Sequence, residues 1–341
     1  MSIIGSTNIR YSGDQTRDTK ESVLDRIVDV SPMDTPLLFM ATRGERPRNI
    51  KHEWVTDSLG AWPSSSGTYV RGEGEDFTPE APTDRVVMFN RTHVWGHAWS
   101  VSETQEAVSL HGIESEYNYQ AAKFSRQTVR EFDWILHNSN IAADATGPNA
   151  GSAGQKRKMG GLIEQIQENA AGNNTFISEG TLATIQRPYN NAVASGENNI
   201  DELKENMRTM WDRGGIVNGR VIALVGSTVK EAFSNNFAPV SATASASIYR
   251  RNIGTGESTR IVLSVDYVET DFGLIYFVLD RSVPSGNAVL FAPEFFHVNV
   301  LRDITKYELA KVGPSYMGAV EGEMTCSLLA PSTASLLTGI A

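Results

Sequence analysis

The sequence has a single cysteine, Cys326, among its 341 residues, so no disulfide can form within the chain. This cysteine lies in the apolar run GEMTCSLLA, which indicates a small core residue rather than a reactive thiol. No apolar run reaches the ~18 residues of a membrane span, and no cationic segment followed by an apolar one marks a signal peptide. We therefore expect synthesis in the cytoplasm and no membrane partner.

Positive charge is scarce, because the 30 Lys and Arg residues are outnumbered by 40 Asp and Glu residues, which gives a net charge of -10. Proteins that grip nucleic acid through its phosphates are usually basic, so this class is disfavoured. The densest basic group is Lys156-Arg157-Lys158, which we interpret as part of a solvated loop. The aromatic residues lack the interleaved basic residues that base stacking in a nucleic-acid groove would need.

Motifs for nucleotide binding and covalent catalysis are also missing. The glycine pairs in RGEGED (71–76) and GTGEST (254–259) lack the strand-then-helix context that cradles a phosphate. The sequence contains no G-x-S-x-G motif, and no histidine lies near Cys326 in the chain. We predict no catalytic residue, no cofactor and no metal site.

His93 and His97 are the exception that has to be weighed, because they lie four residues apart with Glu103 downstream. On a helix, this pair would share a face as zinc ligands do. The surrounding FNRTHVWGHAWSV is aromatic and β-branched and contains Gly96, which favours a strand. We interpret the histidines as polar side chains on an exposed strand face, and keep a metal-dependent hydrolase as an alternative.

The stretch from Thr56 to Arg85 is nearly devoid of core-forming residues. Four glycines and three prolines interrupt its thirty positions. Its seven apolar or aromatic residues are Leu59, Ala61, Trp62, Tyr69, Val70, Phe77 and Ala81. A loop this long inside a folded domain is uncommon and usually functional or disordered.

Strand-like sequences flank this stretch, at residues 49–57 and 85–103. They predict a long hairpin with about fifteen residues on each side, which would reach roughly 50 Å from its base. That distance exceeds the radius of a domain of this size, so the tip is expected to project beyond the subunit.

Residues 112–138 give the clearest helical pattern. The apolar positions step by three or four residues, and acidic residues precede basic ones as the helix dipole favours. The stripe consists of Ile113, Tyr117, Ala121, Phe124, Thr128, Phe132 and Ile135. A helix this long with one apolar stripe predicts a spine on which a sheet packs.

Shorter elements surround this spine. We predict an amphipathic helix after Thr19 that ends at Pro32, a helix over 200–213 capped by Asn199, a strand over 220–226, and a helix capped by Ser227. Further strands are predicted at 261–268, 273–280, 288–291, 294–301 and 305–312, with a closing strand and a terminal segment over 318–340. The fold class is therefore α+β.

This order of segments resembles the Hong Kong 97-type major capsid protein of tailed phages over essentially the whole chain. Two stretches carry the likeness locally, SPMDTPLLFMA (31–41) and ELAKVGPSYMGAVEGEMTCSLLAPSTASLLTGI (308–340). The resemblance implies four parts: an N-terminal arm (1–50), an extended loop (51–95), a peripheral domain (96–194 with 298–341) and an axial domain (195–297).

The resemblance also implies roles for particular residues. Contacts between subunits are expected at Val23, Leu24, Ile27, Trp62, Tyr69, Arg71 and Phe77. The core beneath the spine helix is expected to contain Tyr117, Phe124, Phe132 and Ile135. The extended loop would then lack a core because its partners belong to a neighbouring copy.

The implied function is a structural one: hexamers and pentamers of an icosahedral shell in the virion, enclosing double-stranded DNA. Because the arm starts at Met1 without a preceding scaffolding domain, a separate scaffold protein is expected, together with a portal protein. DNA would be met only by non-specific proximity. A bacterial encapsulin-like nanocompartment shares the fold and is the nearest alternative, and a tail-tube or fibre subunit is a more distant one.

Overall fold

A computed structural model describes most of the chain. The described residues are 31–59, 70–76, 84–108, 112–139, 156–193, 199–237, 266–311 and 313–340. The predicted N-terminal helix and most of the strand predicted at 261–268 lie outside these ranges. Within them, no helix is long and apolar enough to cross a membrane.

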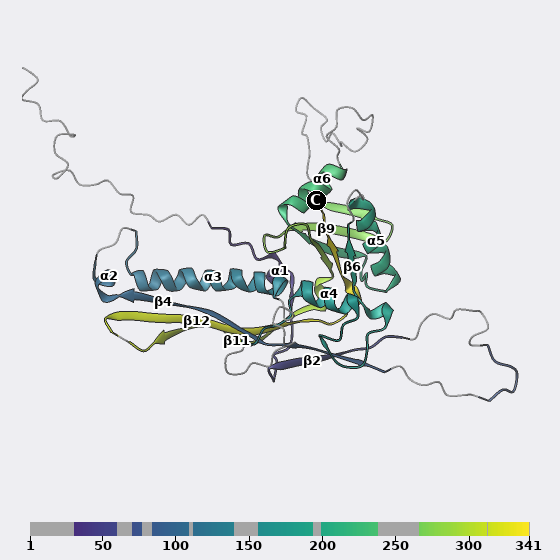
Figure 1. Cartoon of the computed structure of the whole chain (residues 1–341), viewed down its shortest axis with the longest axis horizontal. Coiled ribbons are helices and arrows are strands. Elements are labelled where there is room, and N and C mark those ends of the chain that lie inside the picture. Colours follow the sequence, from purple (N-terminus) through teal and green to yellow (C-terminus); the bar gives the residue numbers. More distant parts are fainter. Residues whose placement is uncertain are drawn as a thin grey trace, which may run out of the picture.

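The subunit has an elongated part, in which one long helix lies along a sheet, and a more compact part at one end of it (Figure 1). The elongated part contains a four-stranded sheet in the order β1-β11-β12-β4. Its elements are β1 (Thr42–Arg43), β4 (His93–Ser102), β11 (Phe296–Leu309), β12 (Ser315–Leu328), α1 (Pro36–Met40), α2 (Glu103–Ala107) and the long helix α3 (Glu116–Asn138).

The compact part is a six-stranded mixed sheet in the order β6-β13-β10-β7-β9-β8, with helices packed on it. Its strands are β6 (Tyr189–Ala192), β7 (Arg220–Val225), β8 (Tyr267–Thr270), β9 (Gly273–Leu279), β10 (Ala288–Phe291) and β13 (Ala334–Thr338). Its helices are α4 (Leu162–Ala171), α5 (Asn199–Asp212), α6 (Ser227–Phe237) and the short 3-10 turns η2 (Thr184–Gln186) and η5 (Pro331–Thr333). A further 3-10 turn, η4 (Pro293–Phe295), contacts β1 and β11 of the elongated part.

A third, three-stranded sheet in the order β2-β3-β5 forms the base of the predicted hairpin. It comprises β2 (Lys51–Thr56), β3 (Val86–Arg91) and β5 (Ile177–Glu179). β2 and β3 pair antiparallel from Lys51 opposite Arg91 to Thr56 opposite Val86, which confirms the pairing expected from the sequence.

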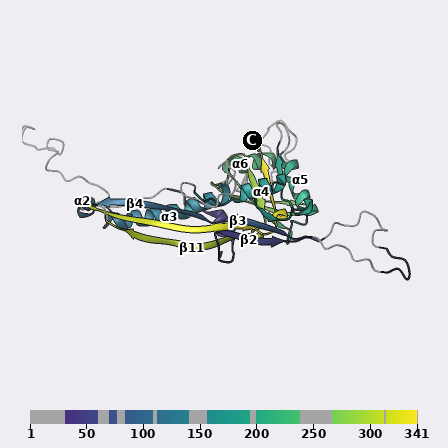
Figure 2. The ribbon, with the colours of Figure 1, turned by 60° about the horizontal axis from the view of Figure 1, so that its bottom comes forward.

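Helix α3 confirms the predicted spine over residues 116–138. It begins four residues after the start of the predicted range 112–138, because Ser115 is its N-cap and the Ser115 hydroxyl accepts a hydrogen bond from the backbone N–H of Asn118 at 3.2 Å. At 1.5 Å per residue the helix is roughly 35 Å long, and it lies along β4 and β12 (Figures 1 and 2).

Aromatic side chains join α3 to the sheet. Trp95 of β4 stacks on Phe132, with ring centroids 4.5 Å apart, and Trp99 stacks on Phe124 at 5.8 Å. The indole N–H of Trp95 also donates to the backbone oxygen of Thr128 at 3.2 Å, so the buried ring leaves no unpaired polar atom. The helix and the sheet therefore share one packed aromatic interface.

Two strand predictions are wrong. The strand predicted at 85–103 is divided at Thr92 into β3 and β4, which belong to different sheets. The sequence indicates separate strands at 294–301 and 305–312, whereas β11 is continuous from Phe296 to Leu309. Its pairing with β12 shifts register between Val300 and Arg302 and again between Arg302 and Thr305. These irregularities place extra residues in one strand without ending the ladder, which explains why the apolar alternation breaks there although the strand continues.

The last strand, β13, lies inside the six-stranded sheet between β6 and β10. Both β6 and β13 thus belong to the same sheet as β7 to β10, although their residues fall in the ranges expected for the peripheral domain and those of β7 to β10 in the range expected for the axial domain. The residues of β10, and those of β13 except Thr338, are buried, so the end of the chain helps to form the core of the compact part.

We predict that Phe132→Ala lowers the free energy of unfolding by about 3–5 kcal/mol, because Phe132 is fully buried and its removal leaves a cavity under Trp95. Chemical denaturation of the soluble subunit measures this change. Trp134→Ala is the matched control on the same helix: its side chain is 54% exposed, so the loss should stay below about 1 kcal/mol. Equal losses in the two variants would contradict the stacking role.

Candidate assembly surfaces

The base of the projecting hairpin is anchored firmly to the body. The indole N–H of Trp54 donates to the backbone oxygen of Leu328 at 3.1 Å, and the hydroxyl of Thr56 donates to the backbone oxygen of Leu329 at 3.0 Å. Trp54 is buried together with Val86. The end of β12 therefore fixes the direction in which the two hairpin strands leave the subunit.

Beyond the last strand pair, the described residues of the hairpin bury little. Leu59 is 93% exposed and Val70 is 73% exposed. All residues from 70 to 76 are exposed, and this short segment lies away from the rest of the described chain (Figure 2). The described residues thus confirm that the hairpin has little core of its own within the subunit.

The segment 70–76 forms a turn held by its own residues. The carboxylate of Glu75 accepts a hydrogen bond from the backbone N–H of Gly72 at 2.8 Å, and Gly74 has a φ of 80°, which favours glycine. Arg71 lies in this turn and donates to the backbone oxygen of Asp76 at 3.2 Å. The other predicted contact residues lie outside the described residues: Val23, Leu24, Ile27, Trp62, Tyr69 and Phe77.

A second surface is the face of the four-stranded sheet that points away from α3. The exposed residues of β4 on this face are Val94, Gly96, Ala98, Ser100 and Ser102. They continue across the sheet, where Ala98 lies opposite Ala319 and then Tyr307, and Ser100 lies opposite Met317 and then Leu309. These two rows carry no charge, whereas Gly96 and Val94 lie opposite Glu321 and Glu323.

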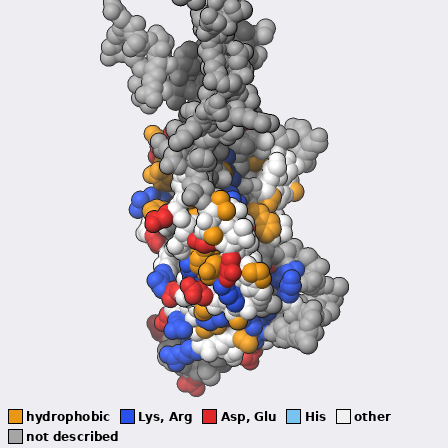
Figure 3. Space-filling model, turned by 90° about the vertical axis from the view of Figure 1, so that its left-hand side faces the viewer, with side chains coloured by type: hydrophobic (Ala, Val, Ile, Leu, Met, Phe, Trp, Pro, Cys, Tyr) orange, Lys and Arg blue, Asp and Glu red, His pale blue; other side chains and the backbone are white. Residues whose placement is uncertain are grey.

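At the far end of the elongated part, charges of both signs are mixed. Figure 3 shows Lys and Arg side chains interspersed with Asp and Glu and with small hydrophobic patches. One ion pair there joins Lys311 to Glu103, and the ammonium group of Lys306 lies 4.7 Å from the ring centre of Tyr117. No broad basic surface is visible among the described residues of this face, which agrees with the acidic composition.

The four predicted spine residues all face the sheet side of α3. Phe132 is fully buried, and Ile135 packs against the same core. Tyr117 and Phe124 are half-buried and pack against the smaller cluster around Trp99. The structure therefore brings these four residues into two neighbouring apolar clusters under one helix.

The alternative metal site is not assembled among the described residues. His93 and His97 lie on strand β4, as expected, but their partners differ: His97 contacts the carboxylate of Glu131 at 2.5 Å, whereas Glu103 pairs with Lys311. The interpretation that both side chains are exposed is wrong, because each of them is partly buried. Burial, and then the charges of Lys158 and Arg157, lower the pKa of His93 to about 4.

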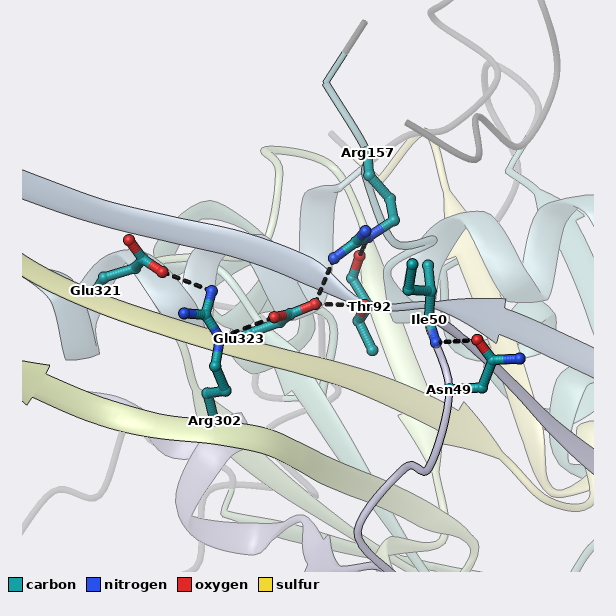
Figure 4. A network of polar contacts seen from close by, with 7 residues as sticks. All are labelled: Asn49, Ile50, Thr92, Arg157, Arg302, Glu321 and Glu323. Atoms are coloured by element: carbon teal, nitrogen blue, oxygen red, sulfur yellow. Dashed lines mark hydrogen bonds and ion pairs between the residues drawn. The ribbon is translucent and has the colours of Figure 1, made fainter. Parts of the chain in front are cut away.

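A buried charge network joins the loop before α4 to the long sheet (Figure 4). Glu323 of β12 accepts hydrogen bonds from the hydroxyl of Thr92 at 2.7 Å and from the guanidinium of Arg302 at 3.0 Å, and it pairs with Arg157. Arg157 also donates to the backbone oxygen of Thr92 at 2.6 Å. Thr92, between β3 and β4, is thereby held at the junction of hairpin and sheet.

Arg157 corrects another expectation. The sequence favours a solvated loop for Lys156-Arg157-Lys158, but the side chain of Arg157 is mostly buried against Glu323. Burial alone would raise the pKa of Glu323, yet the hydrogen bonds from Thr92 and Arg302 and the charges of both arginines outweigh it, so the pKa is lowered. The carboxylate is therefore ionised at neutral pH.

The comparisons with known proteins decide the identity. The family model described as SU10 major capsid protein matches residues 5–341. The chain belongs to this family of major capsid proteins. A search of curated proteins gave no match.

Solved structures support the same fold. A chain of the cyanophage A-1(L) capsid asymmetric unit superposes with a TM-score of 0.68 at 13% identity, covering 97% of this chain and 99% of that one. The capsid of an empty GTA particle gives 0.59 at 12% identity, with coverage of 97% and 99%. Mycobacterium phage Bobi gives 0.54 at 13% identity, with coverage of 95% and 96%.

The chain is thus a major capsid protein of the tailed-phage type, with the Hong Kong 97-type α+β fold that the sequence resembles. Its role is structural, its place is the capsid of the virion, and it oligomerises in that capsid. The encapsulin-like alternative is not favoured.

We predict that Glu323→Gln destabilises the capsid subunit by about 3 kcal/mol at neutral pH, because Arg157 loses the charge that pairs with it in a mostly buried site. The folded-state pKa of Glu323 is lowered, so its contribution is present above the ordinary value of 4.5 and is lost as the pH falls through the folded pKa. Denaturation at several pH values measures the difference.

Glu321→Gln is the matched control, since Glu321 binds the same Arg302 at 2.5 Å but is partly exposed. This variant should lower the free energy of unfolding by no more than about 1 kcal/mol. A Glu323→Gln variant as stable as Glu321→Gln at neutral pH would contradict the role of the network.

Proposed function

We propose that this capsid protein forms the hexamers and pentamers of an icosahedral shell around double-stranded DNA, and that its projecting hairpin completes its packing on a neighbouring subunit. The observation that carries the proposal is the contrast along the hairpin. Its base is pinned by Trp54 and Thr56, while Leu59 and the described turn 70–76 are exposed. A rigid base under an unburied tip favours a contact made outside the subunit.

The energetics support assembly as the source of order. If arms and hairpin bury about 1,000 Å² of apolar surface on neighbours, about 25 kcal/mol of gross stabilisation results. Ordering and association remove much of this gain, so a single contact remains reversible. Many weak contacts then allow errors in a growing shell to anneal, while the closed shell is held by all of them together.

We assign a role in the shell to each of the four parts implied by the sequence. The arm (1–50) and the extended loop (51–95) reach neighbours, and the axial domain (195–297) lies at the centre of a hexamer or pentamer. The peripheral domain (96–194 with 298–341) spans the region between centres. The stiff pairing of α3 with β4 and β12 supports this last role, because a shell wall needs a part that does not bend.

We also propose partners other than further copies of this chain, namely DNA, a scaffold protein and a portal protein. With a net charge of -10, the shell would enclose DNA by proximity without gripping it. A separate scaffold protein and a portal protein would assist assembly in the host cytoplasm, and the subunit would carry no enzymatic activity. Nuclease-protected DNA inside purified particles would separate this function from that of a nanocompartment.

We predict that deleting residues 60–80 leaves a soluble, folded subunit that forms no shells. The strand pair from Lys51 to Thr56 remains, so the melting temperature of the subunit should change by less than about 3 °C. Negative-stain microscopy and size-exclusion chromatography of the expressed protein measure the assembly.

A Gly/Ser segment of the same length in place of residues 60–80 is the matched control. It keeps the reach of the hairpin without Trp62, Tyr69 and Phe77, and it should also fail to give shells if these side chains anchor the hairpin. Shells at normal yield from the deletion would refute the role of the hairpin.

A further inference from the structure

A buried polar joint lies where three parts of the chain meet. Asp133 and His137 lie one turn apart on α3, and Asp280 directly follows β9. All three side chains are buried. Helix α1 packs on α3, beside the six-stranded sheet (Figure 1). The joint thus links the N-terminal segment, the spine helix and the axial sheet.

Each contact of the joint crosses between these parts or fixes the turn after β9. Asp133 accepts a hydrogen bond from the backbone N–H of Leu38 at 2.8 Å and from the hydroxyl of Ser282 at 3.0 Å. Asp280 accepts one from the Nε2 of His137 at 2.8 Å and one from the backbone N–H of Ser282 at 2.8 Å. Every carboxylate oxygen therefore receives a hydrogen bond.

The charges of the joint do not balance. Two carboxylates share the site with one imidazole, and the Nδ1 atom of His137 has no hydrogen-bond partner among the described residues. At the rim, Asp34 and Arg281 pair with each other at 3.3 Å and are exposed, so they compensate the buried charge only weakly.

We propose that Asp133 is an electrostatically strained latch: ionised, it loosens the attachment of the N-terminal segment and the axial sheet to α3, and protonated, it tightens that attachment. Protonation removes one of the two buried negative charges and leaves the hydrogen bond from Leu38 in place. The proton bound is taken from solvent, and no other chemistry is involved. The latch acts within one subunit and does not depend on the proposed assembly.

The asymmetry between the two carboxylates supports this assignment. Burial is the largest influence raising the pKa of Asp133, the charge of Asp280 adds to it, and together they outweigh the hydrogen bonds from Leu38 and Ser282 and the charge of His137. Burial also acts to raise the pKa of Asp280, but the hydrogen bond and charge of His137 and the bonds from Ser282 outweigh it, so that pKa is lowered.

The sign of the pH dependence follows from these directions. Because the folded-state pKa of Asp133 is raised, its stabilising contribution is complete below the ordinary value of 3.8 and is lost as the pH rises through the folded pKa. Asp280 behaves in the opposite way, since its contribution is lost as the pH falls. The two aspartates should therefore respond oppositely to substitution at neutral pH.

The test compares Asp133→Asn and Asp280→Asn in the full-length chain. The amide introduced by Asp133→Asn keeps an acceptor for Leu38 and gains a donor toward Ser282, so this variant should raise the melting temperature by about 2 °C near neutral pH. That gain should shrink as the pH is lowered from about 7 to about 4, while Asp280→Asn should lower the melting temperature near neutral pH.

Amide hydrogen exchange is a second measurement. Its pH dependence would not change if Asp133 had only a structural role. The protection factors of the Leu38 and Ser282 amides should rise about threefold or more on acidification of the wild-type chain, and should stay constant in Asp133→Asn. Asp303→Asn is the matched control and should change neither the melting temperature nor these protection factors. The Oδ1 atom of Asp303 lies 3.8 Å from a guanidinium nitrogen of Arg43, and both side chains are exposed.

Two results would overturn the proposal. One is an Asp133→Asn variant that is destabilised like Asp280→Asn, or whose gain does not depend on pH. The other is zinc present at one equivalent in the purified protein and lost in both variants, which would make the three residues a metal site rather than a protonation latch.

Discussion

The packing of helix α3 on strands β4 and β12 is the interaction on which the rest of the subunit depends. Stacked pairs of aromatic rings, Trp95 with Phe132 and Trp99 with Phe124, hold a helix of 23 residues flat along the sheet. The other end of β12 receives the hydrogen bonds from Trp54 and Thr56. The same strand therefore supports the spine helix and orients the hairpin.

Polar networks, rather than apolar contacts alone, occupy the junctions between the parts. Glu323 holds Thr92 and Arg157 where the hairpin strand passes into the long sheet. The Asp133 joint holds Leu38 and Ser282 where the N-terminal segment and the six-stranded sheet meet α3. Hydrogen bonds with fixed directions set angles more sharply than apolar packing does, and buried charges make those angles sensitive to a single substitution. A shell subunit has to combine a stiff interior with defined angles between its parts.

Local patterns predicted the elements that carry an uninterrupted signal: the spine helix, the hairpin strands, and the helix α5 ended by Gly214 and Gly215. They missed α4, because Glu164, Gln165 and Asn169 are buried polar residues that hide its apolar face. They split β11 at its irregular register, and they could not place β13, whose neighbours β6 and β10 lie far away in sequence. The histidines of β4 and the latch at Asp133 depend on contacts between distant segments, and no spacing in the sequence encodes these.

The most direct test of the account measures amide hydrogen exchange of residues 57–59 and 70–76 in isolated subunits and in assembled shells of the same protein. The account predicts rapid exchange in the isolated subunit, where these described residues are mostly exposed, and strong protection in the shell, where a neighbour covers them. Strong protection already in the isolated subunit, with no further change on assembly, would contradict the central claim that this polypeptide completes its packing only on other copies of itself.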